Sequence, residues 1–364
     1  MRRLGISIYP EHSTKEKDFA YMEKAAKLGF TRIFTCFLSV TKSKEEMIAE
    51  FKEYMDKAHE LGMKVAVDTN PAVFDHLGAK ADDLSVFKEI GVDIVRLDNS
   101  FGVFGDVTTT QNPYGLQIEF NGSSSSDYVE LLLTKGARKD QMLICHNFYP
   151  QKYTGLGYTN FMEWSKRYHE LGFTTAAFVS SNNENTYGPW PVYAGLPTVE
   201  FYRNYPIDTQ ARFLFATNYI DDVIIGNAYA SDQELEALSK IDKDMITIKI
   251  DQEKISELEE EIIYHNIHNW RQDYNDYMVR SSMPRVKYKG RDIPVIPYRE
   301  DFFHKGDVVV INNNLEHYRG ELQIILKDIP NDGERNLVGR VKKEEMCILD
   351  LMDPIKKFKV IRDE

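Results

Sequence analysis

The sequence predicts an α/β fold, namely a (β/α)8 barrel followed by a smaller β-rich domain. Two observations in the first 230 residues support the barrel. One is a repeated pattern of an amphipathic helix, a glycine, a short apolar strand and then polar residues. The other is the number of candidate strands, because eight βα units that close at about 240 residues are typical of this barrel. A change to strands that alternate with turns after residue 243 predicts the second domain.

The eight candidate strands begin near residues 3, 32, 64, 93, 116, 142, 174 and 222. Five of them follow a glycine at the position where a helix C-cap needs a left-handed residue, namely Gly29, Gly62, Gly91, Gly136 and Gly172. The segment 45–61 is typical of the helices, because its apolar residues recur on one face. The segment 182–206, rich in proline, glycine and aromatic residues, is long enough to predict a functional loop. A doubly wound open sheet is the alternative, because counting strands does not prove closure.

We expect the barrel to occupy residues 1–242 and the β-rich domain to occupy residues 243–364. The second domain starts with the strand-like segment MITIKID and a Glu-rich helix over about 253–265. Four further apolar segments follow, IPVIPY, DVVVIN, GELQIIL and EMCILDL, and turns separate them. This order predicts a domain built mainly of strands.

The composition excludes several classes of partner. The chain has 45 Lys and Arg residues against 57 Asp and Glu residues, so its net charge of −12 should repel nucleic acid. The sequence shows neither a signal-peptide core nor an apolar stretch of membrane-spanning length. Its three cysteines lie far apart and form no CxxC pair. We therefore expect a cytoplasmic protein that binds neither nucleic acid nor membranes and that could form a homo-oligomer.

Acidic residues end several of the predicted strands, where parallel barrels carry their active sites. Four of these acids would surround one cavity, namely Glu11, Asp68, Asp98 and Glu119. Hydrolysis of a glycosidic bond requires a pair of carboxyl groups, one protonated and one ionised. Any one of the acids could instead cap a helix or pair with Arg96, but four together favour a functional cleft. The sequence therefore predicts a hydrolytic site at the barrel mouth.

Other strand-end residues are candidates for binding a ligand, namely Tyr9, Arg96, Asn121, His146, Asn147 and Tyr149. Ser180 and Ser181 end the seventh strand, and the loop at this place often holds phosphate in such barrels. In the second domain Arg280 and Arg285 have guanidinium groups that suit phosphate and carboxylate groups. The alternatives are an ordinary polar turn at the serines and a salt-bridged helix face at the arginines.

A metal site is a further alternative, because Asp68, Glu119 and His146 could bind a divalent ion. No compact HxH or HExxH spacing supports it, so we expect neither a metal nor another cofactor. Two functions therefore compete with the glycosidase hypothesis. One is a metal-dependent sugar-phosphate isomerase or aldolase, and the other is a phosphosugar-binding protein without catalysis.

Seven segments together resemble the MupG-type 6-phospho-N-acetylmuramidases of the bacterial cytoplasm: LGISIYPEH, VAVDTNP, VRLDNSFG, IEFNGSSSS, CHNFYPQKYTGL, HNWRQDYNDYMVRSS and YRGELQIIL. The resemblance covers nearly the full length, although Trp270 stands where we expect a smaller polar residue. It implies a barrel followed by a cyclophilin-like domain. It also implies hydrolysis of N-acetylmuramic acid 6-phosphate linked β-1,4 to N-acetylglucosamine, a phosphorylated disaccharide from cell-wall recycling. Retaining, inverting and substrate-assisted routes stay open.

Overall fold

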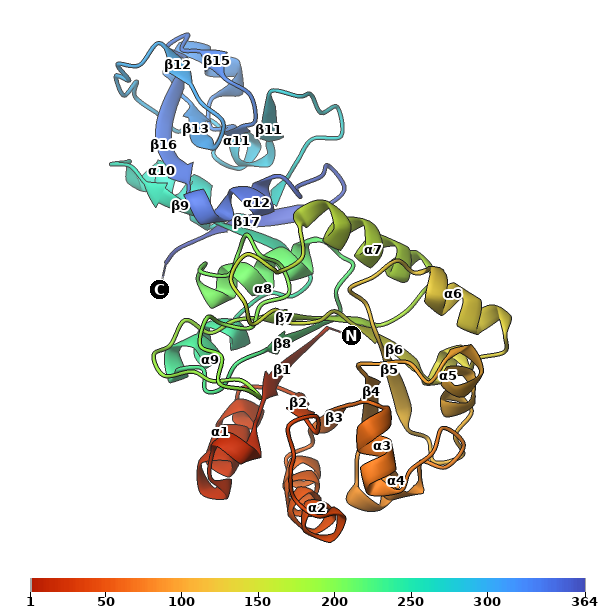
Figure 1. Ribbon diagram of the computed structural model, residues 1–364. Helices are drawn as coiled ribbons and strands as arrows, with labels where there is room; N and C mark the ends of the chain where they lie inside the picture. The colour runs from red at the N-terminus through yellow and green to blue at the C-terminus, as the bar shows by residue number, and fades with distance from the viewer. Residues whose placement is uncertain (1, 364) are drawn as a thin grey trace. The chain divides into compact units, whose positions relative to one another are not determined.

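The computed structural model describes residues 2–363, and the chain divides into two compact units, Met1–Ile241 and Asp242–Glu364. In the first unit eight parallel strands follow one another around a closed barrel (Figure 1). They are β1 (Arg3–Ser7), β2 (Arg32–Cys36), β3 (Lys64–Thr69), β4 (Ile94–Leu97), β5 (Gln117–Asn121), β6 (Met142–Cys145), β7 (Thr175–Val179) and β8 (Asp222–Ile225). Strand β8 pairs with β1. This pairing confirms the predicted barrel and excludes the open sheet.

Helices surround the strands of this unit on the outside, as Figure 1 shows. They are α1 (Lys15–Lys27), α2 (Lys44–Glu60), α3 (Pro71–Leu77), α4 (Ser85–Ile90), α5 (Val103–Thr110), α6 (Asp127–Thr134), α7 (Tyr158–Glu170), α8 (Ile207–Ala216) and α9 (Asp232–Ser239), with short 3-10 helices η1 (Pro10–His12) and η2 (Lys139–Gln141). The five glycines predicted to follow helices have φ angles from 72° to 96°, so this prediction is confirmed. The segment 182–206 contains no regular helix or strand and connects β7 to α8.

The barrel interior has an apolar side and a polar side. Buried residues of β2, β6, β7 and β8 form an apolar cluster that includes Phe34, Cys145, Phe178 and Ile224. On the other side, the register pairs Asp68 of β3 with Arg96 of β4, and Arg96 with Glu119 of β5. Paired residues of neighbouring strands share a face of the sheet, so these charged side chains all point inward. The polar side thus lies along β3, β4 and β5.

The second unit contains a seven-stranded mixed sheet in the order β10-β17-β9-β16-β13-β14-β11 and a separate two-stranded sheet, β12-β15. The strands are β9 (Ile246–Gln252), β10 (His268–Asn269), β11 (Met278–Ser281), β12 (Phe302–Phe303), β13 (Asp307–Ile311), β14 (Leu322–Ile325), β15 (Ile329–Pro330), β16 (Arg335–Val341) and β17 (Lys357–Ile361). Helices α10 (Glu257–Tyr264), α11 (Met283–Lys287) and α12 (Met346–Leu349) and 3-10 helices η3 (Asn313–Tyr318) and η4 (Lys343–Glu345) connect them. Strand β17 is parallel to β9, and its other partner, β10, is antiparallel.

A small core packs against the second sheet, with Phe303, Val309, Ile325 and Leu337 at its centre. This core gives the unit an interior of its own. Within residues 2–363, no helix has the length and apolar character needed to cross a membrane.

Candidate active site

Two aspartates at the barrel mouth share one arginine nitrogen. Arg96 Nη1 lies 2.5 Å from Asp68 Oδ1 and 3.5 Å from Asp98 Oδ1. Because both distances start at the same atom, the two carboxylate oxygens are at most about 6 Å apart. Asp68 and Arg96 lie within neighbouring strands, whereas Asp98 follows the last residue of β4. The arrangement places two acids around one cation at the C-terminal end of the strands.

The environments of the two aspartates differ. The Asp68 side chain is 5% exposed, and the Asp98 side chain is 34% exposed. Burial raises the pKa of Asp68 to about 6, although Arg96 opposes the rise, and the nearby charges of Asp98 and Glu119 add to it. Asp68 can therefore hold a proton close to neutral pH. One buried, protonatable carboxyl beside one that water reaches is the pattern found in acid–base pairs.

Arg96 also organises the polypeptide that follows β6. Its Nη2 donates a hydrogen bond to the amide oxygen of Asn147. The Asn147 backbone N–H donates to Ser123 Oγ over 2.8 Å, which ties the ends of β5 and β6 together. Burial raises the pKa of the nearby Tyr149 hydroxyl, with Ser123 and Arg96 opposing the rise. The structure thus brings the predicted ligand residues Asn147 and Tyr149 to the side of the aspartate pair.

A pocket of about 150 Å³ opens beside Asp98. It is lined by Leu97, Asp98, Ser100, Asp106, Phe120, Asn121, Ser124, Tyr128 and Val129. Asp106 is buried there, and its carboxylate accepts hydrogen bonds from Ser100 Oγ at 2.6 Å and from the Tyr128 hydroxyl at 2.5 Å. Its donors hold Asp106 in place as part of the wall. The pocket thus combines apolar side chains with amide and hydroxyl groups next to Asp98.

Arg203 fixes the loops that surround the mouth, and sequence reasoning missed it. Its Nη1 donates to the carbonyl oxygens of Tyr149 and Ala194 at 2.9 and 3.1 Å. Its Nε and Nη2 hold the Glu200 carboxylate at 2.8 and 2.6 Å. Arg203 is buried, so these contacts are shielded from water. The long loop before α8 gave a signal for function, but no local pattern marks the arginine that anchors it.

Glu119, a predicted catalytic acid, is buried inside the barrel and forms an ion pair with Arg32. Both of its carboxylate oxygens accept hydrogen bonds from Arg32 Nη2, and the side chain is fully buried. Arg32 Nη1 also donates to Asp222 at 2.6 Å, and Asp222 accepts two hydrogen bonds from Arg3. Arg3, Arg32 and Asp222 are the first residues of their strands, so this network belongs to the N-terminal half of the barrel. We therefore assign Glu119 a structural ion pair.

His146, predicted from the sequence to contact a ligand, lies against residues of helix α7. Its Nε2 lies 2.9 Å from Ser165 Oγ of α7, and its ring packs against Phe161. Burial lowers the pKa of His146 to about 3, so the ring is neutral at physiological pH. The alternative metal set of Asp68, Glu119 and His146 is therefore not assembled. Among residues 2–363, no group of three His, Cys, Asp or Glu side chains is placed to hold a metal ion.

Ser180 and Ser181 are committed to partners within the protein. Ser180 Oγ accepts a hydrogen bond from the Leu196 backbone N–H at 3.0 Å. Ser181 Oγ donates to Glu234 at 2.7 Å, and its backbone N–H donates to Asn227 at 2.8 Å. Both serines are buried. Both serines already have partners in the protein, and their role in binding phosphate stays a prediction.

Tyr9 and Glu11 follow β1 and differ in their surroundings. Tyr9 is buried in the apolar cluster, and its hydroxyl donates to the carbonyl oxygen of Gly226 at 2.5 Å. These contacts are with the barrel interior, and the role of Tyr9 in ligand binding stays a prediction. Glu11 lies on η1 and is partly exposed. Within the described part of the chain its carboxylate has no hydrogen bond or ion pair, so it stays a candidate for contact with a ligand.

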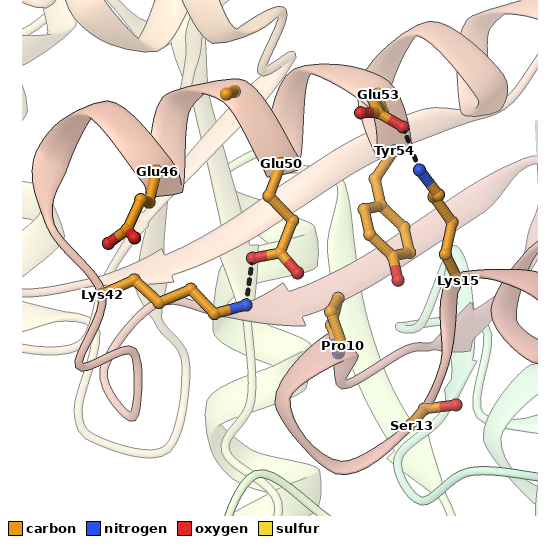
Figure 2. Close-up of a pocket in the computed structure, with 9 residues that line it drawn as sticks. Pro10, Ser13, Lys15, Lys42, Glu46, Glu50, Glu53 and Tyr54 are labelled. Carbon is orange, nitrogen blue, oxygen red and sulfur yellow. Dashed lines mark hydrogen bonds and ion pairs between the residues drawn. The ribbon is translucent and has the colours of Figure 1, made fainter.

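A separate pocket of about 480 Å³ lies beside η1 and α2 (Figure 2). It is lined by Pro10, Ser13, Lys15, Lys42, Glu46, Ala49, Glu50, Glu53 and Tyr54. Figure 2 shows each lysine directed at a glutamate, Lys15 at Glu53 and Lys42 at Glu50. Glu46 adds a further negative charge, so the lining as a whole is negative. This pocket does not suit a phosphate group.

Comparisons with known proteins identify the family. The family model described as 6-phospho-N-acetylmuramidase, N-terminal, matches residues 4–240, and the model for the C-terminal part of the same enzyme matches residues 246–361. The chain belongs to the 6-phospho-N-acetylmuramidase family. It is therefore a glycosidase whose substrate is a small phosphorylated sugar. The resemblance inferred from the seven segments and the predicted enzyme class are both confirmed.

Two solved structures resemble this member of the 6-phospho-N-acetylmuramidase family over their full lengths. The crystal structure of an uncharacterized protein from B. cereus is 45% identical in sequence, covers 99% of both chains and has a TM-score of 0.91. A conserved protein of unknown function from Enterococcus faecalis covers 99% of this chain and 96% of its own, with 24% identity and a TM-score of 0.72. A search of curated proteins finds no match.

The two predicted anion-binding arginines of the second unit differ in their partners. Arg280 is paired with the buried Glu321, at 2.8 Å from Nε and 3.2 Å from Nη2. Arg285 lies with its guanidinium carbon 4.8 Å from the centre of the Tyr318 ring. Its Nη1 is buried and has no hydrogen-bond partner in the described residues. Of these two predicted anion-binding arginines, Arg285 is thus the one without a carboxylate.

Proposed function

We propose that this enzyme hydrolyses N-acetylmuramic acid 6-phosphate linked β-1,4 to N-acetylglucosamine, with Asp68 and Asp98 as the carboxyl pair. The observation that carries the proposal is the shared contact of both carboxylates with Arg96 Nη1. The cation holds both acids on one side of the mouth, close enough for the two to act on one glycosidic bond. The sequence-based set of four candidate acids is thereby reduced, because Glu119 is committed to Arg32.

Asp68 is the better candidate for the general acid. Its pKa of about 6 leaves about half of the Asp68 carboxyl groups protonated at pH 6 and about a tenth at pH 7, and the protonated form can donate a proton to the leaving oxygen. Asp98 is more exposed and follows the end of β4, so it can reach the anomeric carbon, a water molecule or the acetamido group of the sugar. These three possibilities correspond to the retaining, inverting and substrate-assisted routes.

The pocket beside Asp98 supports a substrate that carries an N-acetyl group. Its volume of about 150 Å³ suits a small substituent rather than a sugar ring. Leu97, Phe120 and Val129 offer an apolar surface for the acetyl methyl group, while Asn121 and Tyr128 carry groups that can hydrogen-bond the amide. This combination favours an amino sugar over a plain hexose, since a hexose would leave the pocket unfilled.

The finer role that we propose follows from the family. Release of the two sugars would serve the recovery of cell-wall material in the cytoplasm, where the phosphorylated disaccharide would arrive. Asn147, Tyr149 and Glu11 would contact the sugar hydroxyl groups around the mouth. We further propose that the second unit, with its mixed sheet, is the cyclophilin-like domain that the family resemblance implies.

The test is incubation of the full-length protein with the phosphorylated disaccharide and, separately, with its unphosphorylated form, with reducing sugar as the readout. We expect release only from the phosphorylated form, and a loss of about 100-fold or more in Asp68→Asn and Asp98→Asn. Asp140→Asn is the matched control, because Asp140 is an exposed acid that already pairs with an arginine, Arg138. Undiminished cleavage by both variants would remove the assignment. Tight binding without release would instead support a phosphosugar-binding protein.

A further inference from the structure

The second unit carries a groove of its own, with a volume of about 640 Å³. Such a volume is within the range of small-molecule sites, about 300–1,000 Å³. Trp270 and Tyr274 line it, with their ring centres 5.8 Å apart in an edge-to-face arrangement. Tyr274 is 62% exposed, so an aromatic surface faces the solvent. Aromatic surfaces of this kind suit the C–H groups of a sugar ring.

The indole N–H of Trp270 lacks a hydrogen-bond acceptor in the described residues. The residue is 8% exposed, and its Nε1 has no acceptor within the part of the chain that the structure describes. A buried donor without a partner costs about 1–3 kcal/mol. Buried tryptophan N–H groups usually find an acceptor. Trp270 is also one of the residues that line the groove, so a bound molecule would lie against this side chain.

The groove is positively charged in a chain that is strongly negative. Arg271 and Lys357 line it, and no acidic side chain of residues 2–363 does. The guanidinium of Arg271 is held by Asp273 through bonds of 2.7 Å from Nε and 2.6 Å from Nη2. This pairing fixes the orientation of the fork and leaves Nη1 for another acceptor. With a net charge of −12 for the whole chain, such a site favours an anionic ligand.

Two more arginines add to the positive charge next to the groove. The guanidinium carbons of Arg280 and Arg285 lie 5.9 and 4.8 Å from the centre of the Tyr318 ring. Arg271 is close enough to Tyr318 and Glu321 to interact with them electrostatically. Asp273 pairs with Arg271 and Glu321 pairs with Arg280, so these three guanidinium groups exceed their two carboxylate partners by one positive charge. A net positive charge suits a phosphate group.

We propose that this groove of the second unit binds an amino sugar that carries a phosphate, with the sugar ring on Trp270 and Tyr274 and the phosphate at Arg271 and Lys357. The choice of an amino sugar rests on the proposed function. The aromatic lining suits a sugar ring, and the indole N–H of Trp270 is a donor without an acceptor. The cations suit the phosphate group. The groove would thus give the second unit a binding site of its own for a phosphorylated amino sugar.

The test follows the fluorine NMR signals of the full-length protein labelled with 5-fluorotryptophan. The chain has three tryptophans, Trp164, Trp190 and Trp270, and Trp270→Phe assigns the third signal. N-acetylglucosamine 6-phosphate should shift the Trp270 signal until saturation. N-acetylglucosamine should bind at least about tenfold more weakly, because it lacks the phosphate that the cations hold. A Trp270 signal that stays fixed with the phosphorylated sugar would overturn the proposal.

Arg271→Gln should weaken the response of Trp270 to the phosphorylated sugar by about tenfold. Arg138→Gln is the matched control, because Arg138 also pairs with an aspartate two residues later and lies on the other unit. It should leave the response unchanged. The signals of Trp164 and Trp190 report whether the first unit of each variant is folded, and the Trp270 signal without ligand reports the same for the second unit. Equal binding by Arg271→Gln and the wild type would overturn the assignment of the phosphate to this groove.

The outcome can be separated from that of the proposed reaction. N-acetylglucosamine 6-phosphate has no glycosidic bond, so the Trp270 signal does not depend on hydrolysis. If the Trp270 signal responds but the protein does not cleave the disaccharide, the groove stands as a binding site and the proposed reaction is contradicted. If the protein cleaves the disaccharide but the phosphorylated sugar leaves the Trp270 signal unchanged, the proposed reaction stands and the groove is not the binding site.

Discussion

Replacing Glu119 with glutamine should lower the stability of the barrel far more than its activity. Glu119 and Arg32 are both fully buried, and their ion pair lies in the half of the barrel away from the mouth. Glutamine has nearly the same shape but no charge, so the guanidinium of Arg32 keeps only Asp222 as a charged partner. The variant therefore separates a structural role of Glu119 from a catalytic one.

The expected loss can be worked out from the pairing. Removing one partner of a buried ion pair costs about 3–5 kcal/mol, because the other charge stays buried without compensation. We expect the lower end, about 3 kcal/mol in the free energy of unfolding, since Asp222 still faces Arg32. For a unit of this size, each kcal/mol shifts the melting temperature by about 2–4 °C, so Tm should fall by about 6–12 °C.

The assay is thermal unfolding followed by circular dichroism, with turnover of the folded variant measured well below its Tm. Turnover should stay within about tenfold of the wild type, and the pH optimum should move lower because the charge of Glu119 contributes to the raised pKa of Asp68. Asp98→Asn is the comparison, with Tm nearly unchanged and turnover lost. An unchanged Tm together with abolished turnover in Glu119→Gln would refute the structural assignment.

Three further outcomes follow from the proposed site. The wild-type kcat/KM should fall as pH rises through about 6, because Asp68 then loses the proton that it donates; a flat profile from about pH 5 to pH 8 would contradict this role. Steady-state kinetics of Arg96→Lys should show kcat reduced by about 10- to 100-fold with little change in KM, because an ammonium group cannot hold Asp68 and Asn147 together; an unchanged kcat would remove Arg96 from the proposal. Ser181→Ala should lower the unfolding free energy by about 1 kcal/mol in denaturant titrations and leave KM unchanged, because its hydroxyl serves Glu234; a tenfold rise in KM would return the β7 loop to the site.

The barrel could be predicted because its signals are local and repeated. Five of the eight strands follow a glycine with positive φ just after a helix, and an apolar run marks the strand itself, so both features can be read within a few residues. Closure itself is a long-range property, set by the pairing of β1 with β8. The strand order of the second unit is likewise long-range, and its alternating apolar segments predicted strands without their pairing.

The candidate site was predicted in part, for reasons that lie in strand geometry. Asp68 and Arg96 were identified because both stand close to the ends of their strands. Glu119 was taken to stand at the end of the segment LQIEF, but β5 continues to Asn121, and the carboxylate pairs with an arginine 87 residues away. The inward and outward alternation that turns His146 toward α7 depends on the register, which the sequence alone does not reveal.

In the second unit the sequence marked Trp270 only as a departure from expectation. In the folded chain Trp270 lines the same groove as Lys357, a residue that comes much later in the sequence. The strand pairing explains the placement, because β10 and β17 are antiparallel and Asn269 lies opposite Lys357. Residues this far apart in the sequence leave no periodic signal of their later proximity.

The most direct test of the aspartate pair is a crystal structure of Asp98→Asn with the intact phosphorylated disaccharide bound. We expect the glycosidic oxygen within about 3 Å of the Asp68 carboxyl group, with the N-acetyl group in the pocket beside residue 98. A glycosidic oxygen that lies out of reach of Asp68, for example next to Glu11, would contradict the proposed hydrolytic centre.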